Sequence, residues 1–492
     1  MLEKILGMSA AAERVEAAAL VAGAWVGSGP QNERIGPFSA RVVSSAPRAT
    51  AGDVVAVRAF ARENAAGVAR MSPASRADVL ERAAVAVARH RDDLARLLAL
   101  ELGKPVKDGR GELDRVADTF AVCAAEARRI GGENLPVAGW ARGAGTTALT
   151  FRAPVGVALV ITPFNAPANL LAHKLGASFA AGNTTIVKAP PQAPAISTAL
   201  VALLVEAGMP LGAVQLLHGG GEVGAALCGA PEVAVISFTG SPETGAAVAR
   251  AAGAKRLVLE LGGNAATIVC EDADLEAAAE VCARTGYSNS GQSCVSVQRV
   301  YVQETRFEEF LALFRDRVAA LRVGDPLDPA TDVGAMVDEN AAERVVDWSA
   351  KAAADGARIL IGGTREGATA APTIVADPDP AALVVTEEVF GALVAVLPYR
   401  GFAEVIETCN SGRYGLQAGL FTRDLERIIT AWRDLQVGGV IVNGSSNFRL
   451  DHIPFGGVKD SGFGRESPRC MIGDFTHVKT LMLRGTSIWG EN

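Results

Sequence analysis

The sequence lacks the features that mark several large classes of protein. Cysteine occurs seven times in 492 residues, at scattered positions and never as Cys-x-x-Cys, so we expect neither a disulfide framework nor a metal site. Scattered thiols are typical of a reducing compartment, which predicts a cytoplasmic protein. No cluster of lysine and arginine offsets the net charge of −7. Nucleic acid and anionic membrane surfaces are therefore not expected as partners, because both require a basic surface.

A long uninterrupted apolar run is also missing. The most apolar stretch, VGVALVITPFNAPANLLAHKLGASFAAG at residues 155–182, is broken by prolines, two asparagines, a histidine and a lysine. A membrane helix needs about 20 consecutive apolar residues, so this stretch is predicted to lie in a protein core. The first residues show no basic segment followed by an apolar core, and no signal peptide is predicted.

Helical and strand patterns divide the chain into two α/β parts. Residues 51–130 repeat apolar residues at three- and four-residue spacing, as packed helices do. Short apolar runs then alternate with helical segments, which predicts parallel sheets with helices on both faces. The fold class is therefore α/β, with two doubly wound parallel-sheet domains joined near residues 260–264.

Polar residues and glycines follow the predicted strands of the first part, in ITPFNAP, VKAPPQAP, HGGGEVG, FTGSPETG and ELGGNA. Parallel sheets bind ligands at the carboxyl ends of their strands, so these segments predict a binding cleft. In FTGSPETG, Gly240 and Ser241 precede a predicted helix, whose first N–H groups favour an anion. GGGEVG matches G-x-G-x-x-G, but the acidic residue expected downstream is absent. We interpret Gly221 and Gly224 as part of a glycine-rich turn beside a cofactor.

One cysteine stands apart from the others. Cys294 lies in GYSNSGQSCVS, among small, polar and glycine residues that indicate irregular backbone. A cysteine kept for packing usually has bulky apolar neighbours, whereas a reactive cysteine needs access and often hydrogen-bond donors. The residues alone leave both interpretations open.

Six motifs taken together resemble the aldehyde dehydrogenase superfamily in order and spacing. They are TPFN, FTGSPETG, ELGGN, GQSC, EEVFG and PFGGVKDSGFGRE. The resemblance extends over nearly the whole chain and is nearest to branches that oxidise lactaldehyde, glyceraldehyde 3-phosphate or phosphonoacetaldehyde. It implies an NAD(P)-dependent enzyme that oxidises an aldehyde to an acid.

The resemblance also implies three catalytic residues. Cys294 would attack the aldehyde to form a thiohemiacetal, which becomes a thioester after hydride transfer. The Asn165 side chain and the Cys294 N–H would form an oxyanion hole, and Glu260 would activate the hydrolytic water. By themselves, Asn165 could be a turn residue and Glu260 a salt-bridged strand end. The presence of Glu260 disfavours a CoA-acylating enzyme, and the complete set disfavours a non-catalytic, cofactor-binding structural protein.

The implied cofactor is NAD or NADP. Lys188 would contact the adenosine ribose, Ser241 the pyrophosphate, and Glu388 and Phe390 the nicotinamide end. Pro191 stands where NAD-preferring members commonly carry a glutamate, so a 2′-phosphate would meet no repulsion and NADP is expected as an alternative. The full set of implied cofactor contacts is Ile161, Thr162, Pro163, Phe164, Lys188, Pro191, Gly221, Gly224, Phe238, Gly240, Ser241, Leu261, Gly262, Glu388 and Phe390.

Two arginines predict a small polar or anionic aldehyde as the substrate. Arg110 and Arg449 occupy segments that face the substrate tunnel in relatives, and arginine donates in pairs to carboxylate or phosphate oxygens. Alternatively, Arg110 pairs with Glu112 or Asp114, and Arg449 with Asp451. A broad-specificity or semialdehyde dehydrogenase then remains possible. The full set of implied substrate contacts is Arg110, Ala166, His173, Ser293, Arg449 and Phe455.

The resemblance implies a division of the chain into three parts. Residues 1–130 and 150–260 would bind NAD(P), and residues 261–460 would form the catalytic domain. Residues 131–149 and 470–492 would form a small β oligomerisation element, with its hairpin and C-terminal strand paired between subunits. A dimer or tetramer is expected.

Overall fold

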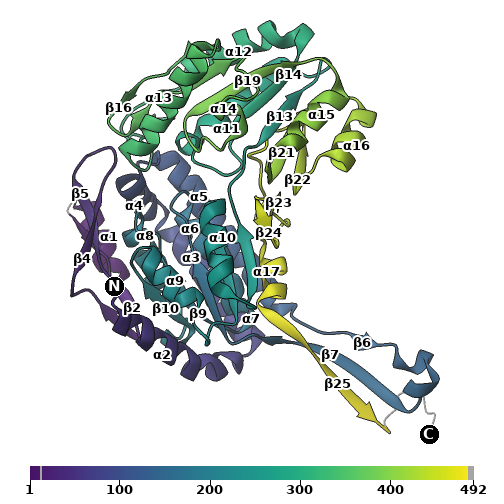
Figure 1. Cartoon of the computed structure of the whole chain (residues 1–492). Helices are drawn as coiled ribbons and strands as arrows, with labels where there is room; N and C mark the ends of the chain where they lie inside the picture. Colours follow the sequence, from purple (N-terminus) through teal and green to yellow (C-terminus); the bar gives the residue numbers. More distant parts are fainter. Residues whose placement is uncertain (12–13, 486–492) are drawn as a thin grey trace.

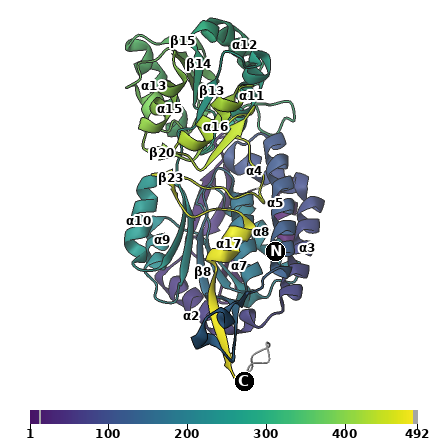
Figure 2. The same ribbon diagram turned by 90° about the vertical axis from the view of Figure 1, so that its right-hand side faces the viewer.

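The computed structural model describes residues 1–11 and 14–485. Two α/β domains are stacked on one another, and a narrow β arm projects from the first (Figure 1). The view turned by 90° shows the same stacking, with β25 running down into the arm (Figure 2). None of the helices in the described part of the chain is long and apolar enough to cross a membrane.

The first domain is built on an eight-stranded sheet with the strand order β24-β12-β11-β8-β9-β10-β2-β3. Its five central strands are parallel, because each crossover passes through a helix. These strands are β8 (Val157–Ile161), β9 (Thr184–Lys188), β10 (Val214–Leu217), β11 (Val235–Thr239) and β12 (Arg256–Glu260). The antiparallel edge strands are β2 (Ala19–Val21), β3 (Ala24–Val26) and β24 (Gly462–Phe463).

Helices cover both faces of this sheet, and the predicted helical region 51–130 forms four of them. These are α2 (Ala51–Ala69), α3 (Pro73–Arg89), α4 (Arg91–Leu102) and α5 (Val106–Arg128). The remaining helices are α1 (Leu2–Ala10), α6 (Pro167–Leu171), the π-helical turn η3 (Ala172–Gly176), α7 (Ala177–Ala181), α8 (Pro194–Glu206), η4 (Leu211–Ala213), α9 (Gly221–Cys228), α10 (Pro242–Ala252) and α17 (Pro468–Asp474). A separate small sheet joins β1 (Val15–Glu16), β5 (Val42–Pro47) and β4 (Gln31–Ile35).

The second domain has a seven-stranded sheet, parallel except for its edge strand β15. In spatial order its strands are β15 (Arg358–Ile361), β18 (Thr373–Ala376), β19 (Leu393–Tyr399), β14 (Arg299–Gln303), β13 (Ala266–Val269), β21 (Gln417–Phe421) and β22 (Gly439–Val442). Its helices are α11 (Leu275–Tyr287), η5 (Ser288–Gly291), η6 (Glu304–Arg306), α12 (Phe307–Ala319), α13 (Glu339–Ala354), α14 (Leu383–Thr386), α15 (Phe402–Ser411) and α16 (Leu425–Asp434). β16 (Arg365–Glu366) and β17 (Thr369–Ala370) form a short hairpin, and β20 (Tyr414–Gly415) pairs antiparallel with the distant β23 (Val458–Lys459). The predicted α/β class with two parallel-sheet domains is confirmed.

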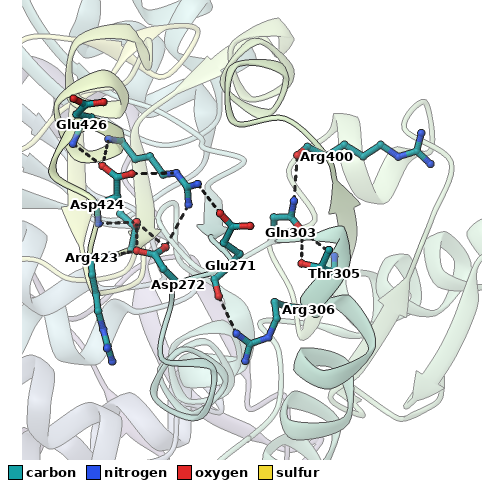
Figure 3. Close-up of polar contacts among 11 residues, drawn as sticks. Glu271, Asp272, Gln303, Thr305, Arg306, Arg400, Arg423, Asp424 and Glu426 are labelled. Atoms are coloured by element: carbon teal, nitrogen blue, oxygen red, sulfur yellow. Dashed lines mark hydrogen bonds and ion pairs between the residues drawn. The ribbon is translucent and has the colours of Figure 1, made fainter.

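The two sheets meet end to end, with carboxyl ends of strands in the first facing amino ends of strands in the second. The carboxyl ends of β8, β9, β11 and β12 face the loops that enter β13 and β14. Ion pairs occupy the carboxyl end of β13 instead, where Arg427 of α16 binds Glu271 at 2.8 Å and Asp272 at 3.4 Å. Asp272 also accepts from the Arg423 N–H, and the Glu271 carbonyl accepts from Arg306 (Figure 3). These contacts anchor α16 and η6. The ligand cleft lies at the carboxyl ends of strands in the first sheet.

The β arm corrects one expectation. It consists of β6 (Asn134–Leu135), the turns η1 (Val137–Gly139) and η2 (Ala141–Gly143), β7 (Thr146–Pro154) and β25 (Thr476–Arg484). β25 pairs antiparallel with β7 over its whole length, from Thr476 opposite Pro154 to Arg484 opposite Thr146. Pairing of these segments between subunits is therefore wrong: they pair within one chain. Residues 486–492 of the predicted element lie outside the described residues.

Candidate active site

A cavity of about 1090 Å³ lies between the two domains. Its walls include Asn165, Glu260 and Cys294, the three predicted catalytic residues, although they are far apart in sequence. Every predicted cofactor contact lines the same cavity, as do the predicted substrate contacts Ala166, Ser293, Arg449 and Phe455. The fold thus brings into one space motifs that lie on segments far apart in the sequence.

Cys294 lies in the irregular segment between η5 and β14. Asn289 and Ser290 adopt positive φ angles of 49° and 57°, which turns the chain sharply before the cysteine. The thiol is partly exposed to the cavity. Burial, together with the negative charges of Glu388 and Glu260, raises the pKa of Cys294 to about 12. The resting group is therefore a neutral thiol, which must lose its proton before it can attack.

Asn165 is tied directly to the loop of the cysteine. Its side-chain Nδ2 donates to the Gln292 carbonyl at 3.1 Å, and its own carbonyl accepts from Lys104 Nζ at 2.6 Å and from Asn289 Nδ2 at 3.1 Å. Among the described residues, the backbone N–H of Cys294 has no acceptor. The second Nδ2 proton of Asn165 and this N–H are the donors that an oxyanion beside the thiol requires.

Glu260 is the last residue of β12 and is only 3% exposed. Neither carboxylate oxygen has a hydrogen-bond partner among the described residues, so it is not the salt-bridged strand end that the sequence left open. Burial raises the pKa of Glu260 well above its ordinary value, and the charge of Glu466 adds to the shift. A carboxyl group shifted in this way can act as a general base near neutral pH.

The other end of the cavity fits a dinucleotide. Ser241 caps α10 by accepting from the Thr244 N–H at 3.3 Å, which leaves the first turn of the helix beside the cavity for an anion. Burial lowers the pKa of Lys188 to about 8. Glu388 accepts from the Gly263 N–H at 2.9 Å, and the Phe164 and Phe390 rings meet edge to face at 5.8 Å. These residues would hold the pyrophosphate, the ribose hydroxyls and the nicotinamide end of NAD(P).

Two predicted substrate residues do not line the cavity. Arg110 binds Asp92 on α4, with Nε 2.8 Å from Oδ1, and its predicted place at the tunnel is wrong. It pairs with neither of the carboxylates that the sequence suggested. His173 is fully buried in η3 and contacts Asp451 Oδ1 through Nε2 at 2.9 Å. The His173 side chain therefore lies beneath the cavity wall and does not line the cavity.

Sequence reasoning missed Arg115, which lines the cavity from the same helix as Arg110. Its guanidinium binds Asp451 through two bonds, Nε to Oδ2 at 2.9 Å and Nη2 to Oδ1 at 2.7 Å. Arg110 and Arg115 are five residues apart, or about 140° around a helix at 3.6 residues per turn. Periodicity could have shown that they flank the buried face of α5 on opposite sides, but not which side meets the cavity.

Arg449 is held from several directions. Its Nη2 lies 3.0 Å from Glu466 Oε1, its Nε lies 3.7 Å from Asp451 Oδ1, and its guanidinium carbon lies 4.1 Å from the centre of the Phe455 ring. The predicted alternative, pairing with Asp451, is thus present, but Arg449 lines the cavity as well. Both arginines therefore reach the space that contains Cys294.

Comparisons of the sequence and of the structure with known proteins point to the same family. The sequence profile of the aldehyde dehydrogenase family matches residues 25–481. The 3-sulfolactaldehyde dehydrogenase of Priestia aryabhattai is 40% identical over 464 residues, which are 94% of this chain and 97% of that one. Aldehyde dehydrogenase 21 of Physcomitrella patens, solved with its reaction product succinate, is 34% identical, has a TM-score of 0.93, and matches over 96% of this chain and 99% of its own. The NADP-dependent glyceraldehyde-3-phosphate dehydrogenase of Bacillus halodurans C-125, solved with NADP, is 32% identical, with a TM-score of 0.93 and 95% and 99% coverage.

Proposed function

The chain belongs to the aldehyde dehydrogenase family, and on that premise we propose that it oxidises a small aldehyde with an anionic end to the carboxylic acid. The predicted family, enzyme class and NAD(P) dependence are confirmed. The substrate, the residue roles and self-association as a dimer or tetramer remain proposals.

One observation carries the proposal for the substrate: Arg115 and Arg449 line the same cavity as Cys294. Paired guanidinium groups bind carboxylate, sulfonate or phosphate oxygens through charge-assisted hydrogen bonds. The relatives support this choice, because one is named for sulfolactaldehyde and another was solved with succinate.

The proposed mechanism uses three residues of the chain. The Cys294 thiol gives its proton to a water molecule, and its sulfur forms a bond to the aldehyde carbon; the resulting oxyanion accepts hydrogen bonds from Asn165 Nδ2 and the Cys294 N–H. NAD(P), when bound, would accept the hydride, which would leave a thioester. Glu260 takes a proton from a second water molecule, which attacks the thioester carbon; the carbon–sulfur bond breaks, the acid is released, and the sulfur regains a proton from Glu260.

The test is the rate of reduced-cofactor formation with aldehydes of equal length that end in a neutral, carboxylate, sulfonate or phosphate group, each with NAD and with NADP. A specificity constant about a hundredfold higher for an anionic end corresponds to about 2–3 kcal/mol of transition-state stabilisation. Equal values for neutral and anionic aldehydes would instead indicate a broad-specificity enzyme. Adding CoA tests the acylating alternative, since only that reaction would yield acyl-CoA.

A further inference from the structure

The two arginines belong to a network of ion pairs in which positive groups outnumber negative ones. Arg115 lies 2.7 Å from Asp451, Arg449 bridges Asp451 at 3.7 Å and Glu466 at 3.0 Å, and Lys174 lies 2.7 Å from Glu466. Three cations thus share two carboxylates. The cluster carries one net positive charge.

The groups packed against this cluster do not change its net charge. His173 lies 2.9 Å from Asp451 and 3.2 Å from Arg449 Nη2; burial and the neighbouring guanidinium lower the pKa of His173, so it stays neutral. Lys104 and Glu112, which pack beside Arg115, form an ion pair with each other. Beyond the cluster, Glu260 and Arg465 carry one charge of each sign when Glu260 is ionised.

Only part of the cluster faces the cavity. Arg115, Arg449 and Glu466 line it, whereas Lys174 and Asp451 are buried behind them. Arg115 donates to Asp451 through Nε and through Nη2. Its third nitrogen, Nη1, has no acceptor among the described residues. An anionic group therefore meets donors from the arginines and, close by, the carboxylate of Glu466.

We propose that this site selects aldehydes whose far end carries one negative charge, a carboxylate or a sulfonate, over those with a dianionic phosphate, and that Asp451 sets this preference. The inference rests on the proposed function and refines it. One negative charge neutralises the cluster, while a second would be uncompensated in a partly dehydrated site and would repel Glu466. Asp451 sets the preference because its carboxylate cancels one of the two guanidinium charges.

The unmodified enzyme provides the first test. With matched aldehydes at pH 8, we expect kcat/KM to be at least tenfold higher for the carboxylate and sulfonate ends than for the phosphate end. A phosphate monoester has a second pKa of about 6, so its disadvantage relative to the carboxylate is expected to shrink at pH 6. The ratio at each pH removes effects of pH on the enzyme itself. Equal or better use of phosphate at pH 8 would overturn the inference but leave the proposed function intact; no preference over a neutral aldehyde would overturn the proposed function.

The Asp451→Asn variant provides the second test. It keeps the shape of the side chain and removes one negative charge, which raises the net charge of the cluster by one, so the phosphate-to-carboxylate ratio of kcat/KM is expected to rise at least tenfold. Asp92→Asn is the matched control, because it removes a carboxylate that pairs with Arg110 away from the cavity; its ratio should equal that of the unmodified enzyme. A folded Asp451→Asn enzyme with an unchanged ratio would contradict the inference. Should that variant not fold, the pH comparison on the unmodified enzyme decides.

Discussion

Gly263 packs against Cys294 so closely that a Cβ atom added to the glycine would lie 2.2 Å from the Cys294 carbonyl oxygen. Gly263 follows Glu260 by three residues in the segment that joins the two domains. The same short segment therefore positions the proposed base at its beginning and contacts the backbone of the proposed nucleophile at its end. This close approach fixes the two reacting groups relative to each other.

Gly263→Ala is expected to reduce kcat/KM by about a hundredfold or more and to destabilise the fold by about 1–3 kcal/mol, because a backbone oxygen must move to admit the methyl group. Enzyme assays and chemical denaturation measure both effects. The control is Gly412→Ala, since a Cβ at Gly412 would meet nothing within 4 Å and its φ of −72° suits any residue. Equal behaviour of the two variants would show that the contact has no catalytic consequence.

Cys294→Ala is expected to abolish aldehyde oxidation while NAD(P) binding persists, because the thiol supplies the bond to substrate but only one part of the cavity wall. Steady-state assays and fluorescence titration of the reduced cofactor separate the two properties. Cys228, which also lines the cavity, gives a matched variant, Cys228→Ala, expected to retain turnover. An unchanged rate in Cys294→Ala would remove the assignment of the nucleophile.

Glu260→Gln is expected to stop the reaction after one turnover. The amide cannot accept the proton of water, so the thioester should accumulate after a burst of reduced cofactor, and kcat should fall by about 10²–10⁴-fold. In the unmodified enzyme the pKa of Glu260 is raised, so the basic form appears only as the pH rises, and hydrolysis should accelerate in that direction. Stopped-flow absorbance and mass spectrometry of the acylated protein measure both; rapid steady turnover by the glutamine variant would contradict the role.

Arg449→Ala and Arg115→Ala are each expected to lower kcat/KM for an anionic aldehyde by about ten- to a hundredfold, the value of one charge-assisted contact of about 1.5–3 kcal/mol. The rate with a neutral aldehyde of the same length should change much less. Arg110→Ala is the control from the same helix as Arg115, since Arg110 pairs with Asp92 outside the cavity. A loss in Arg110→Ala equal to that in Arg115→Ala would point to general damage to α5.

Lys188 is expected to make the use of NADP depend on pH. Its pKa is lowered to about 8 by burial, so the ammonium charge is complete below that value and is lost as the pH rises through it. We expect kcat/KM for NADP to fall about tenfold from pH 7 to pH 9, with NAD as the internal reference. In Lys188→Met the NADP-to-NAD ratio should be low and independent of pH; a constant ratio in the unmodified enzyme would argue against a contact with the 2′-phosphate.

Features that depend on local pattern could be predicted before the fold was known. Apolar periodicity predicted the helices of residues 51–130, because a side chain's burial repeats with the period of its element. Short apolar runs predicted the five parallel strands of the first sheet. Among the parallel strands of the second sheet, β18 and β21 were not predicted. β21, QAGLF, includes a glutamine and a glycine, and its contacts with β13 and β22 bury it despite this composition.

Contacts between residues far apart in the sequence follow from the folded structure and not from local pattern. Arg110 and Arg115 have the same chemistry on one helix, and the packing of α5 places one at Asp92 and the other at the cavity. Likewise, antiparallel pairing joins β25 to β7 within one chain. Asp451 and Glu466 acquire their partners on α5 and η3 only when segments 336 and 292 residues apart in sequence meet. Charge balance around a site is a sum over such neighbours, and a linear sequence does not contain the distances that define them.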